Sequence, residues 1–151
     1  MSTVLAYYHA VISTRYRQIT IDERNKQELF AYIAGIMKKM SCQPIIINGI
    51  GNHIHLLFNL HQSTRLSDLM KEIKRSSSLW MKSVPEKFPR FQGWGKEYAA
   101  FAVSFSRKQQ VIAYIKDQEA HHHRETFDQE LQRFVLAHEM PFRPYQTTDD
   151  D

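Results

Sequence analysis

The sequence has a single cysteine, no long apolar run and no leader-like start. With Cys42 alone among 151 residues, no disulfide can form within the chain, as is typical of a reducing compartment. No apolar run approaches the ~20 residues that a membrane-spanning helix needs. The opening residues "MSTVLAYYHAVIST" lack the basic and apolar regions of a signal peptide. Together these absences predict a cytoplasmic protein without a membrane-spanning segment.

Composition predicts one folded domain. Hydrophobic residues make up 42% of the chain, and apart from the acidic end "TTDDD" no low-complexity block or internal repeat is present. We therefore expect a single domain over residues 1–151, with residues 144–151 as a flexible acidic tail.

Positive charge is concentrated in the middle of the chain. Residues 61–110 hold ten Lys and Arg against four Asp and Glu, whereas residues 111–151 hold four against nine. A basic segment of this kind would suit a phosphate-binding surface. A solvated helix face accounts for it equally well, so charge alone leaves both interpretations open.

The hydrophobic pattern predicts an order of strands and helices. Strand-like runs occupy residues 4–16 and 97–106, and two more lie within residues 44–60, separated by an Asn48-Gly49 turn signal. Helical periodicity covers residues 20–40, 65–84, 107–123 and 126–140. Capping-box spacing marks two helix starts, at Thr20–Glu23 and at Thr126–Gln129. The order β-α-β-β-α-β indicates an α+β, ferredoxin-like (split βαβ) antiparallel sheet with two helices on one face and additional C-terminal helices.

Two histidines stand in the middle of the strand-like stretch "GNHIHLLFNL". Because side chains alternate across a strand, Ile54 and Leu56 would face the helix-covered core, while His53 and His55 would share the opposite face. Two imidazoles at this spacing could bind one metal ion. They could equally be structural histidines that hydrogen-bond to their neighbours.

The helix predicted over residues 107–123 could complete such a site. Tyr114 and Gln118 lie one turn apart on one face, and His121 and His122 continue that face. If the apolar side of this helix docks on the open sheet face, Tyr114 and Gln118 approach the histidine strand. Taken alone, Tyr114 fits a packing role and Gln118 a surface role.

Several stretches, in order, resemble one known family. They are "YYHAVISTRYR", "INGIGNHIHLL", "IKRSSSLW", "WGKEYAAFAVSFS" and "YIKDQEAHHH". Together they are similar to the HUH single-tyrosine transposases of insertion sequences that move as single-stranded DNA, including the REP-associated tyrosine transposases. HUH denotes histidine, bulky hydrophobic residue, histidine, which is His53-Ile54-His55 here.

The resemblance implies a set of roles. Tyr114 would be the catalytic nucleophile, and His53, His55 and Gln118 would hold a divalent metal, Mg²⁺ or Mn²⁺. His121, His122 or His9 could replace or supplement Gln118, with His122 ranked first among the three as a possible additional ligand. His9 lies on the first strand, and its face is not fixed by the sequence. The substrate would be single-stranded DNA with a hairpin (repeat) structure, cleaved and rejoined through a 5′-phosphotyrosine. The family works as a homodimer, whose active site can be completed in trans. A member would be cytoplasmic and nucleoid-associated, in a bacterium or an archaeon.

Predicted phosphate contacts come mainly from the basic middle of the chain. They are Arg15, Arg17, Lys71, Lys74, Arg75 and Lys82. Trp94 or Phe91 could stack on an exposed base, although a core position is the simpler expectation for Phe91.

Two other functions share this fold. One is a non-catalytic module for single-stranded nucleic acid, although the chain lacks a clear RNP-type aromatic strand. The other is a domesticated relative that nicks DNA without moving its own gene.

Overall fold

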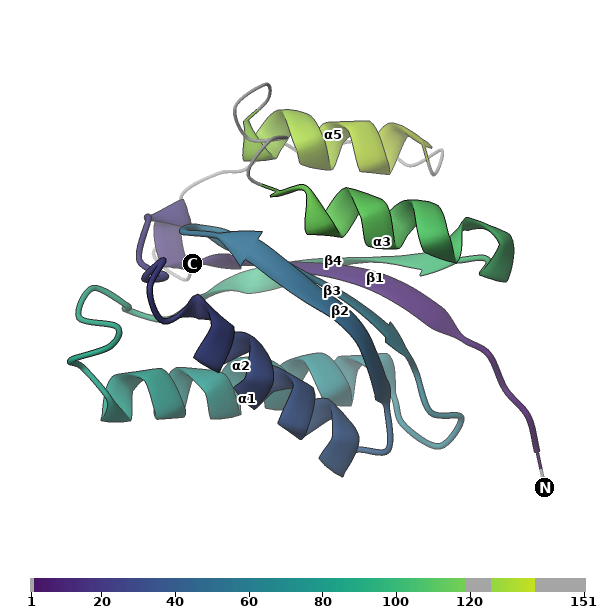
Figure 1. The fold of residues 1–151 in the computed structure, drawn as a ribbon, viewed down its shortest axis with the longest axis horizontal. Helices are drawn as coiled ribbons and strands as arrows, with labels where there is room; N and C mark the ends of the chain where they lie inside the picture. Colours follow the sequence, from purple (N-terminus) through teal and green to yellow (C-terminus); the bar gives the residue numbers. More distant parts are fainter. Residues whose placement is uncertain (1, 119–125, 138–151) are drawn as a thin grey trace.

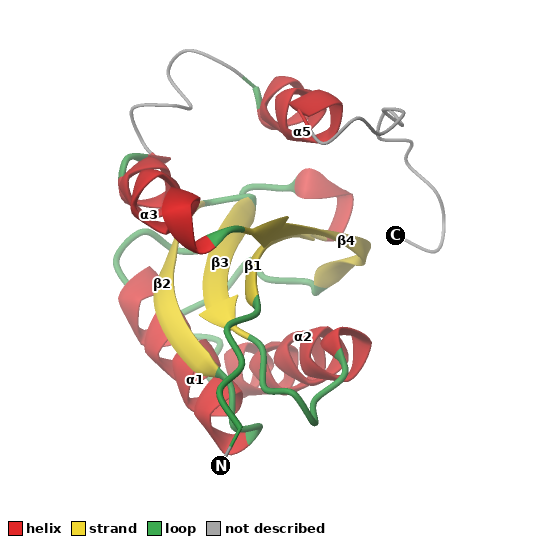
Figure 2. Cartoon of the chain, turned by 90° about the vertical axis from the view of Figure 1, so that its right-hand side faces the viewer, coloured by secondary structure: helices red, strands yellow, loops and turns green. Residues whose placement is uncertain are grey.

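The computed structural model describes residues 2–118 and 126–137, and its centre is a four-stranded antiparallel sheet. The strands are β1 (Tyr7–Thr14), β2 (Gln43–Ile50), β3 (His53–Asn59) and β4 (Trp94–Val103), in the order β2-β3-β1-β4. Helices α1 (Lys26–Lys39) and α2 (Leu66–Ser83) cover one face (Figure 1). Helices α3 (Lys108–Lys116) and α5 (Phe127–Ala137) lie over the other face (Figure 2). The predicted α+β class with a ferredoxin-like element order is confirmed.

The main core lies between the sheet and helices α1 and α2. Strand β3 contributes alternate residues Ile54, Leu56 and Phe58, each with no exposed surface, because side chains two apart share a face. Leu29 and Ile33 of α1 meet them from the helix side. The alternation of side chains predicted along β3 is therefore correct. His53 and His55 face the side of the sheet that α3 and α5 cover.

The β2–β3 hairpin turns later than its sequence predicts. Asn48 and Gly49 lie inside β2, paired with His55 and Ile54, and the chain turns at Gly51 and Asn52. The Asn48 side chain instead donates a hydrogen bond to the Ile115 carbonyl of α3, at 2.9 Å. A long-range contact here overrides a local turn signal.

The start of α1 also differs from its prediction. Helix α1 begins at Lys26, not at the Thr20–Glu23 box, and its Asn25 cap makes no side-chain capping bond. The backbone N–H groups of Thr20 and Ile21 both donate to the Gly51 carbonyl, at 2.9 Å each. This segment is therefore held in a non-helical conformation by the hairpin turn.

Strand β4 begins at Trp94, three residues before the predicted start at residue 97. The Trp94 indole is buried and donates to the Ser77 hydroxyl of α2 at 2.9 Å, while Phe91 packs edge-on against it. Both rings belong to the core, and stacking of either ring on a DNA base stays a prediction. The core position expected for Phe91 is confirmed.

The C-terminal helices are described in part. The Thr126–Gln129 capping box is confirmed by two reciprocal bonds, of 2.9 and 3.2 Å, at the start of α5. His121, His122 and the predicted tail at residues 144–151 lie outside the described residues. Within residues 2–118 and 126–137, no helix combines the length and the apolar character needed to cross a membrane.

Two glycine substitutions test how tightly the hairpin packs. A Cβ added at Gly49 would lie 2.4 Å from the His53 carbonyl oxygen and 2.6 Å from the Ile54 Cα, both backbone atoms. We predict that Gly49→Ala lowers the free energy of unfolding by about 1–3 kcal/mol, as overpacking does. Gly35→Ala is the matched control, because its Cβ meets nothing within 4 Å on α1. The control should be neutral or stabilising by up to ~1 kcal/mol in urea unfolding. Equal effects of the two changes would contradict the tight hairpin.

Candidate metal and tyrosine site

The site is on the sheet face opposite α1 and α2, where three histidines gather. His53 and His55 come from β3, and His9 comes from β1, where it pairs with Leu57 of β3. Because paired residues on neighbouring strands share a face, His9 lies on the same side as the other two. His53 and His55 have no exposed surface, and His9 has 2%. The sequence alone did not determine the face of His9.

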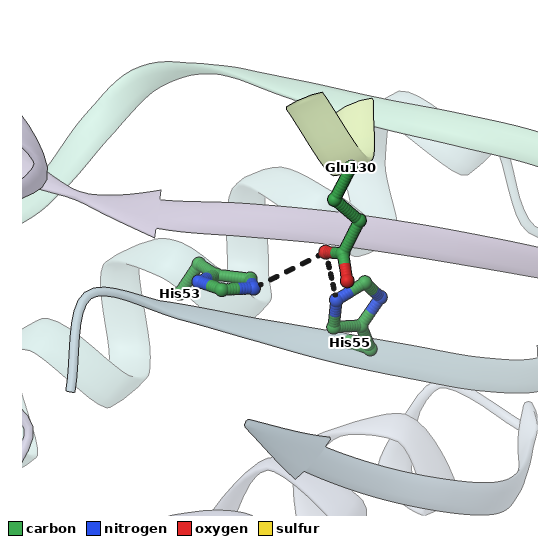
Figure 3. Close-up of side chains that lie close together, drawn as sticks. All are labelled: His53, His55 and Glu130. Carbon is green, nitrogen blue, oxygen red and sulfur yellow. Dashed lines mark hydrogen bonds and ion pairs between the residues drawn. The ribbon is translucent and has the colours of Figure 1, made fainter. Parts of the chain in front are cut away.

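Glu130 of α5 completes a cluster with the two β3 histidines (Figure 3). Its Oε1 lies 2.8 Å from the His55 Nε2 and 3.3 Å from the His53 Nε2. One ligand atom from each residue lies within 4.8 Å of the others. Two imidazoles and one carboxylate are a donor set that divalent metals such as Mn²⁺ accept. The cluster could therefore hold a divalent metal ion.

The Nδ1 atom of each β3 imidazole contacts a polar partner. The His53 Nδ1 lies 2.8 Å from the Asn52 Oδ1, and the His55 Nδ1 lies 2.7 Å from the His9 Nε2. Ligating histidines usually donate their other N–H in this way, which fixes the tautomer that presents a lone pair to the metal. His9 thus lies behind His55, outside the His53–His55–Glu130 cluster.

The chemistry of the His53 ring supports a cation at this point. The amide oxygen of Asn52 accepts the Nδ1 proton, so a neutral His53 points the lone pair of Nε2 toward a Glu130 oxygen. Two acceptors 3.3 Å apart repel each other unless a second proton or a cation lies between them. The residues present therefore fit a metal ion.

Tyr114 of α3 contacts the cluster directly. Its hydroxyl donates a short hydrogen bond to the Glu130 Oε2, and its ring meets His55 edge-on with centroids 6.0 Å apart. The Arg133 Nη2 of α5 donates to the same hydroxyl oxygen at 2.9 Å. The structure thus brings Tyr114 to the histidines of its own chain. Helix α3 is held there by Asn48 and by the fully buried Ile115, which confirms the predicted docking on this face.

Gln118, the third ligand implied by the resemblance, lies just beyond α3. It has no exposed surface, and its amide nitrogen and oxygen have no hydrogen-bond partner among the described residues. A buried amide without partners costs about 1–3 kcal/mol, so such a group calls for an explanation. A ligand role would supply one, because a metal ion would take the amide oxygen.

Helix α5 covers the site through contacts at its first turn. Phe127 stacks on the His53 ring with centroids 4.1 Å apart, and the Arg17 guanidinium lies 4.6 Å from the Phe127 ring centroid. Arg17 also forms an ion pair with Asp128. Arg17, predicted to contact DNA, is therefore engaged with α5 in this structure.

Glu130 was missed by the sequence interpretation. The available signal was its spacing on the helix: Phe127, Leu131 and Phe134 form an apolar stripe, and Glu130 falls on the same face. A carboxylate on the buried face of a helix needs a partner, and its exposed fraction here is 1%. Its partner His55 lies in β3, 75 residues earlier in the chain. The spacing of residues within one helix does not identify a partner in another element.

A basic groove of about 650 Å³ lies between α2 and β4, on the opposite side of the sheet. Five of the six predicted phosphate contacts line it, namely Arg15, Lys71, Lys74, Arg75 and Lys82. Arg75 is partly offset by Glu72, whose carboxylate it contacts at 2.8 Å. Hydrogen bonds from Ser76 and Arg75 lower the pKa of Glu72, so this carboxylate is ionised at neutral pH.

Comparison with known proteins agrees with this fold. The family model described as "Transposase IS200 like" matches residues 2–118, and the chain belongs to that family. A search of curated proteins found no match.

Two solved structures share the fold. A candidate transposase from Deinococcus radiodurans R1 has a TM-score of 0.60 and 22% identity, over 78% of this chain and 95% of that chain. A REP-associated tyrosine transposase bound to a REP hairpin has a TM-score of 0.61 and 14% identity, over 99% of this chain and 92% of that chain.

Metal binding is testable without DNA. We predict that Mn²⁺ raises the thermal unfolding midpoint of the wild-type protein, since a ligand at 100 times its Kd stabilises the folded state by ~2.7 kcal/mol. His55→Ala and Glu130→Gln should reduce or abolish this shift, because each removes a charged or lone-pair donor from the cluster. His61→Ala, an exposed histidine outside the site, is the control. A shift that survives in His55→Ala would place the metal elsewhere.

Proposed function

We propose that this protein is a metal-dependent, single-tyrosine transposase that cleaves and rejoins single-stranded DNA at hairpin ends. One observation supports this most directly: the Tyr114 hydroxyl lies against the Glu130 carboxylate that also contacts His53 and His55. Family membership supports DNA processing by a transposase. The proposal adds the chemistry and the residues that perform it.

In this proposal the Tyr114 oxygen attacks the scissile phosphorus. A bond forms between that oxygen and phosphorus, and the bond from phosphorus to the 3′-oxygen breaks. The Glu130 Oε2, which accepts the hydroxyl hydrogen bond, is positioned to take the phenol proton. The departing 3′-oxygen gains a proton from water and becomes a free 3′-hydroxyl. The 5′-phosphotyrosine retains the bond energy, so later attack by a 3′-hydroxyl rejoins strands without a nucleotide cofactor.

A divalent metal, Mg²⁺ or Mn²⁺, would supply Lewis-acid activation of the phosphate in this site. His53 and His55 would hold it through their Nε2 atoms, oriented by Asn52 and His9. We propose that the oxygen ligands are Glu130 together with the buried amide of Gln118. Two imidazoles favour Mn²⁺ over the more oxygen-selective Mg²⁺. His122 stays a prediction as an additional ligand.

The basic groove is the proposed hairpin contact. Lysines and arginines line the groove between α2 and β4. Their positive charges could neutralise successive phosphates of a duplex stem. The neighbour solved with a REP hairpin is consistent with this partner. Arg17 could join these contacts only by leaving its ion pair with Asp128.

We further propose that the protein is a homodimer in the bacterial or archaeal cytoplasm. As an alternative to the contact within one chain, Tyr114 of one subunit would complete the histidine site of the other.

The non-catalytic binding module is less favoured by the structure. A module that stacks bases on its sheet needs an open sheet face. Here α3 and α5 cover that face, and His53, His55 and Phe101 are buried beneath them. The domesticated, DNA-nicking relative keeps the same site chemistry, and the sequences that flank the gene would separate it from an active element.

Covalent trapping tests the nucleophile. We expect a hairpin-tailed single-stranded oligonucleotide and Mn²⁺ to give a protein–DNA adduct that withstands denaturing electrophoresis. Tyr114→Phe should abolish the adduct, because phenylalanine has no oxygen to attack phosphorus, and His53→Ala should reduce it at least ~10-fold. Tyr32→Phe, whose ring stacks on Trp80 between α1 and α2, is the matched control. An adduct that persists in Tyr114→Phe would remove this tyrosine from the mechanism.

Salt dependence tests the groove. Lys74→Ala should weaken hairpin binding and reduce the slope of log K against log salt concentration by ~1, as the loss of one phosphate contact does. Lys38→Ala, an exposed lysine on α1 outside the groove, should leave the slope unchanged. Fluorescence anisotropy at several salt concentrations measures both. Equal slopes for the two variants would place the hairpin on another surface.

A further inference from the structure

We propose that Arg133 is a catalytic residue that binds the scissile phosphate beside the Tyr114 oxygen. This inference rests on the proposed phosphotyrosine chemistry and adds a residue that neither the family motif nor the histidine cluster assigns. It starts from one contact: the Arg133 Nη2 donates to the Tyr114 hydroxyl oxygen at 2.9 Å.

Helix α5 presents two opposite charges to one oxygen. Glu130 and Arg133 are three residues apart, and side chains at this spacing share a helix face. The Tyr114 hydroxyl donates its hydrogen to Glu130 and accepts a hydrogen from Arg133. A phenol has one hydrogen and two lone pairs, so both contacts can exist at once. The reacting atom is thus held between an acceptor and a permanent cation.

Arg133 also lies on the accessible side of the site. Glu130 and the two β3 histidines are buried, whereas Arg133 is exposed. Its guanidinium lies over the rings of Tyr114 and Phe134, 5.1 Å and 5.0 Å from their centroids, and these contacts hold it beside the tyrosine. A strand that reaches Tyr114 from solvent therefore meets Arg133 at the same point.

The reaction makes this position chemically significant. When the Tyr114 oxygen bonds to phosphorus, the nonbridging oxygens are attached to the same phosphorus atom and lie next to Arg133. A guanidinium has five N–H donors in a rigid plane, so one guanidinium can contact the tyrosine oxygen and a phosphate oxygen at the same time. Negative charge is spread over the phosphoryl oxygens in the transition state, where a fixed cation lowers the barrier. Arg133 would go on holding the phosphate in the phosphotyrosine.

Three variants of Arg133 and one control separate a catalytic role from a packing role. Arg133→Ala removes the side chain beyond Cβ and leaves room for a free guanidinium ion. Arg133→Met keeps an unbranched stem over the Tyr114 and Phe134 rings but removes the charge and the donors. Arg133→Lys keeps the positive charge but lacks the planar guanidinium with its several N–H donors. Gln132→Ala, at an exposed neighbouring position on α5, is the matched control. Each full-length protein is compared for single-turnover adduct formation at saturating hairpin oligonucleotide and Mn²⁺, for oligonucleotide Kd and for thermal midpoint.

We expect Arg133→Met to slow adduct formation by ~10²–10³-fold, the usual cost of removing one donor to a transition-state oxyanion. Its oligonucleotide Kd and thermal midpoint should remain close to those of wild type. Arg133→Lys should recover part of the rate, and guanidinium ion at a non-denaturing concentration should accelerate Arg133→Ala. Gln132→Ala should react like wild type.

The outcomes distinguish this inference from the proposed function. If the wild-type protein forms no adduct, the phosphotyrosine proposal fails, and the role of Arg133 fails with it. If the wild-type protein forms the adduct and Arg133→Met does so at the same rate, only the role of Arg133 is overturned. The role of Arg133 is also overturned if Arg133→Met is slow and loses thermal stability, while Arg133→Lys recovers no rate and guanidinium ion does not accelerate Arg133→Ala. Arg133 would then only position α5.

Discussion

The arrangement of β3, α3 and α5 around the candidate site depends on the Glu130 carboxylate, which is buried between two imidazoles and a phenol. A carboxylate that is 1% exposed is stable only when its oxygens are paired, and its partners come from β3 and α3. The pairing therefore requires β3 to turn its histidines toward α5 and α3 to dock with Tyr114 facing them. Phe127 and Phe134 supply the apolar contacts that hold α5 over these groups. Removing any one element would leave a buried charge or lone pair without its partner.

The same requirement extends behind the histidines. His9 and Asn52 occupy the Nδ1 atoms, so the Nε2 atoms are the ones that meet Glu130. Asn52 belongs to the hairpin turn, and its backbone carbonyl also accepts the Thr14 N–H at 2.9 Å. Gly49 allows the two hairpin strands to approach closely just before this turn. Asn52 in the hairpin turn and His9 in β1 thus set the orientation of the two candidate metal-binding imidazoles.

The sequence predicts those features that depend on periodicity. Alternation along β3 placed His53 and His55 on the correct face, and the Thr126–Gln129 capping box marked the start of α5. Local signals failed where distant contacts were stronger: Thr20 is tied to the hairpin turn, and Asn48 binds the end of α3. Glu130 was missed because its partners come from another element, and spacing within a helix does not identify them.

The two candidate surfaces lie on opposite sides of the sheet, and one short turn joins them. Arg15 lines the basic groove between α2 and β4, while Arg17, two residues later, pairs with Asp128 at the start of α5. Tyr16 and Arg17 have φ values of 55° and 53°, a region that costs energy for residues other than glycine. This strained turn points its two arginines at different elements. If a hairpin stem lies in the groove, as proposed, the stem and the tyrosine site under α5 would share the turn from Arg15 to Arg17. DNA binding would then be coupled to the position of Glu130 and Arg133.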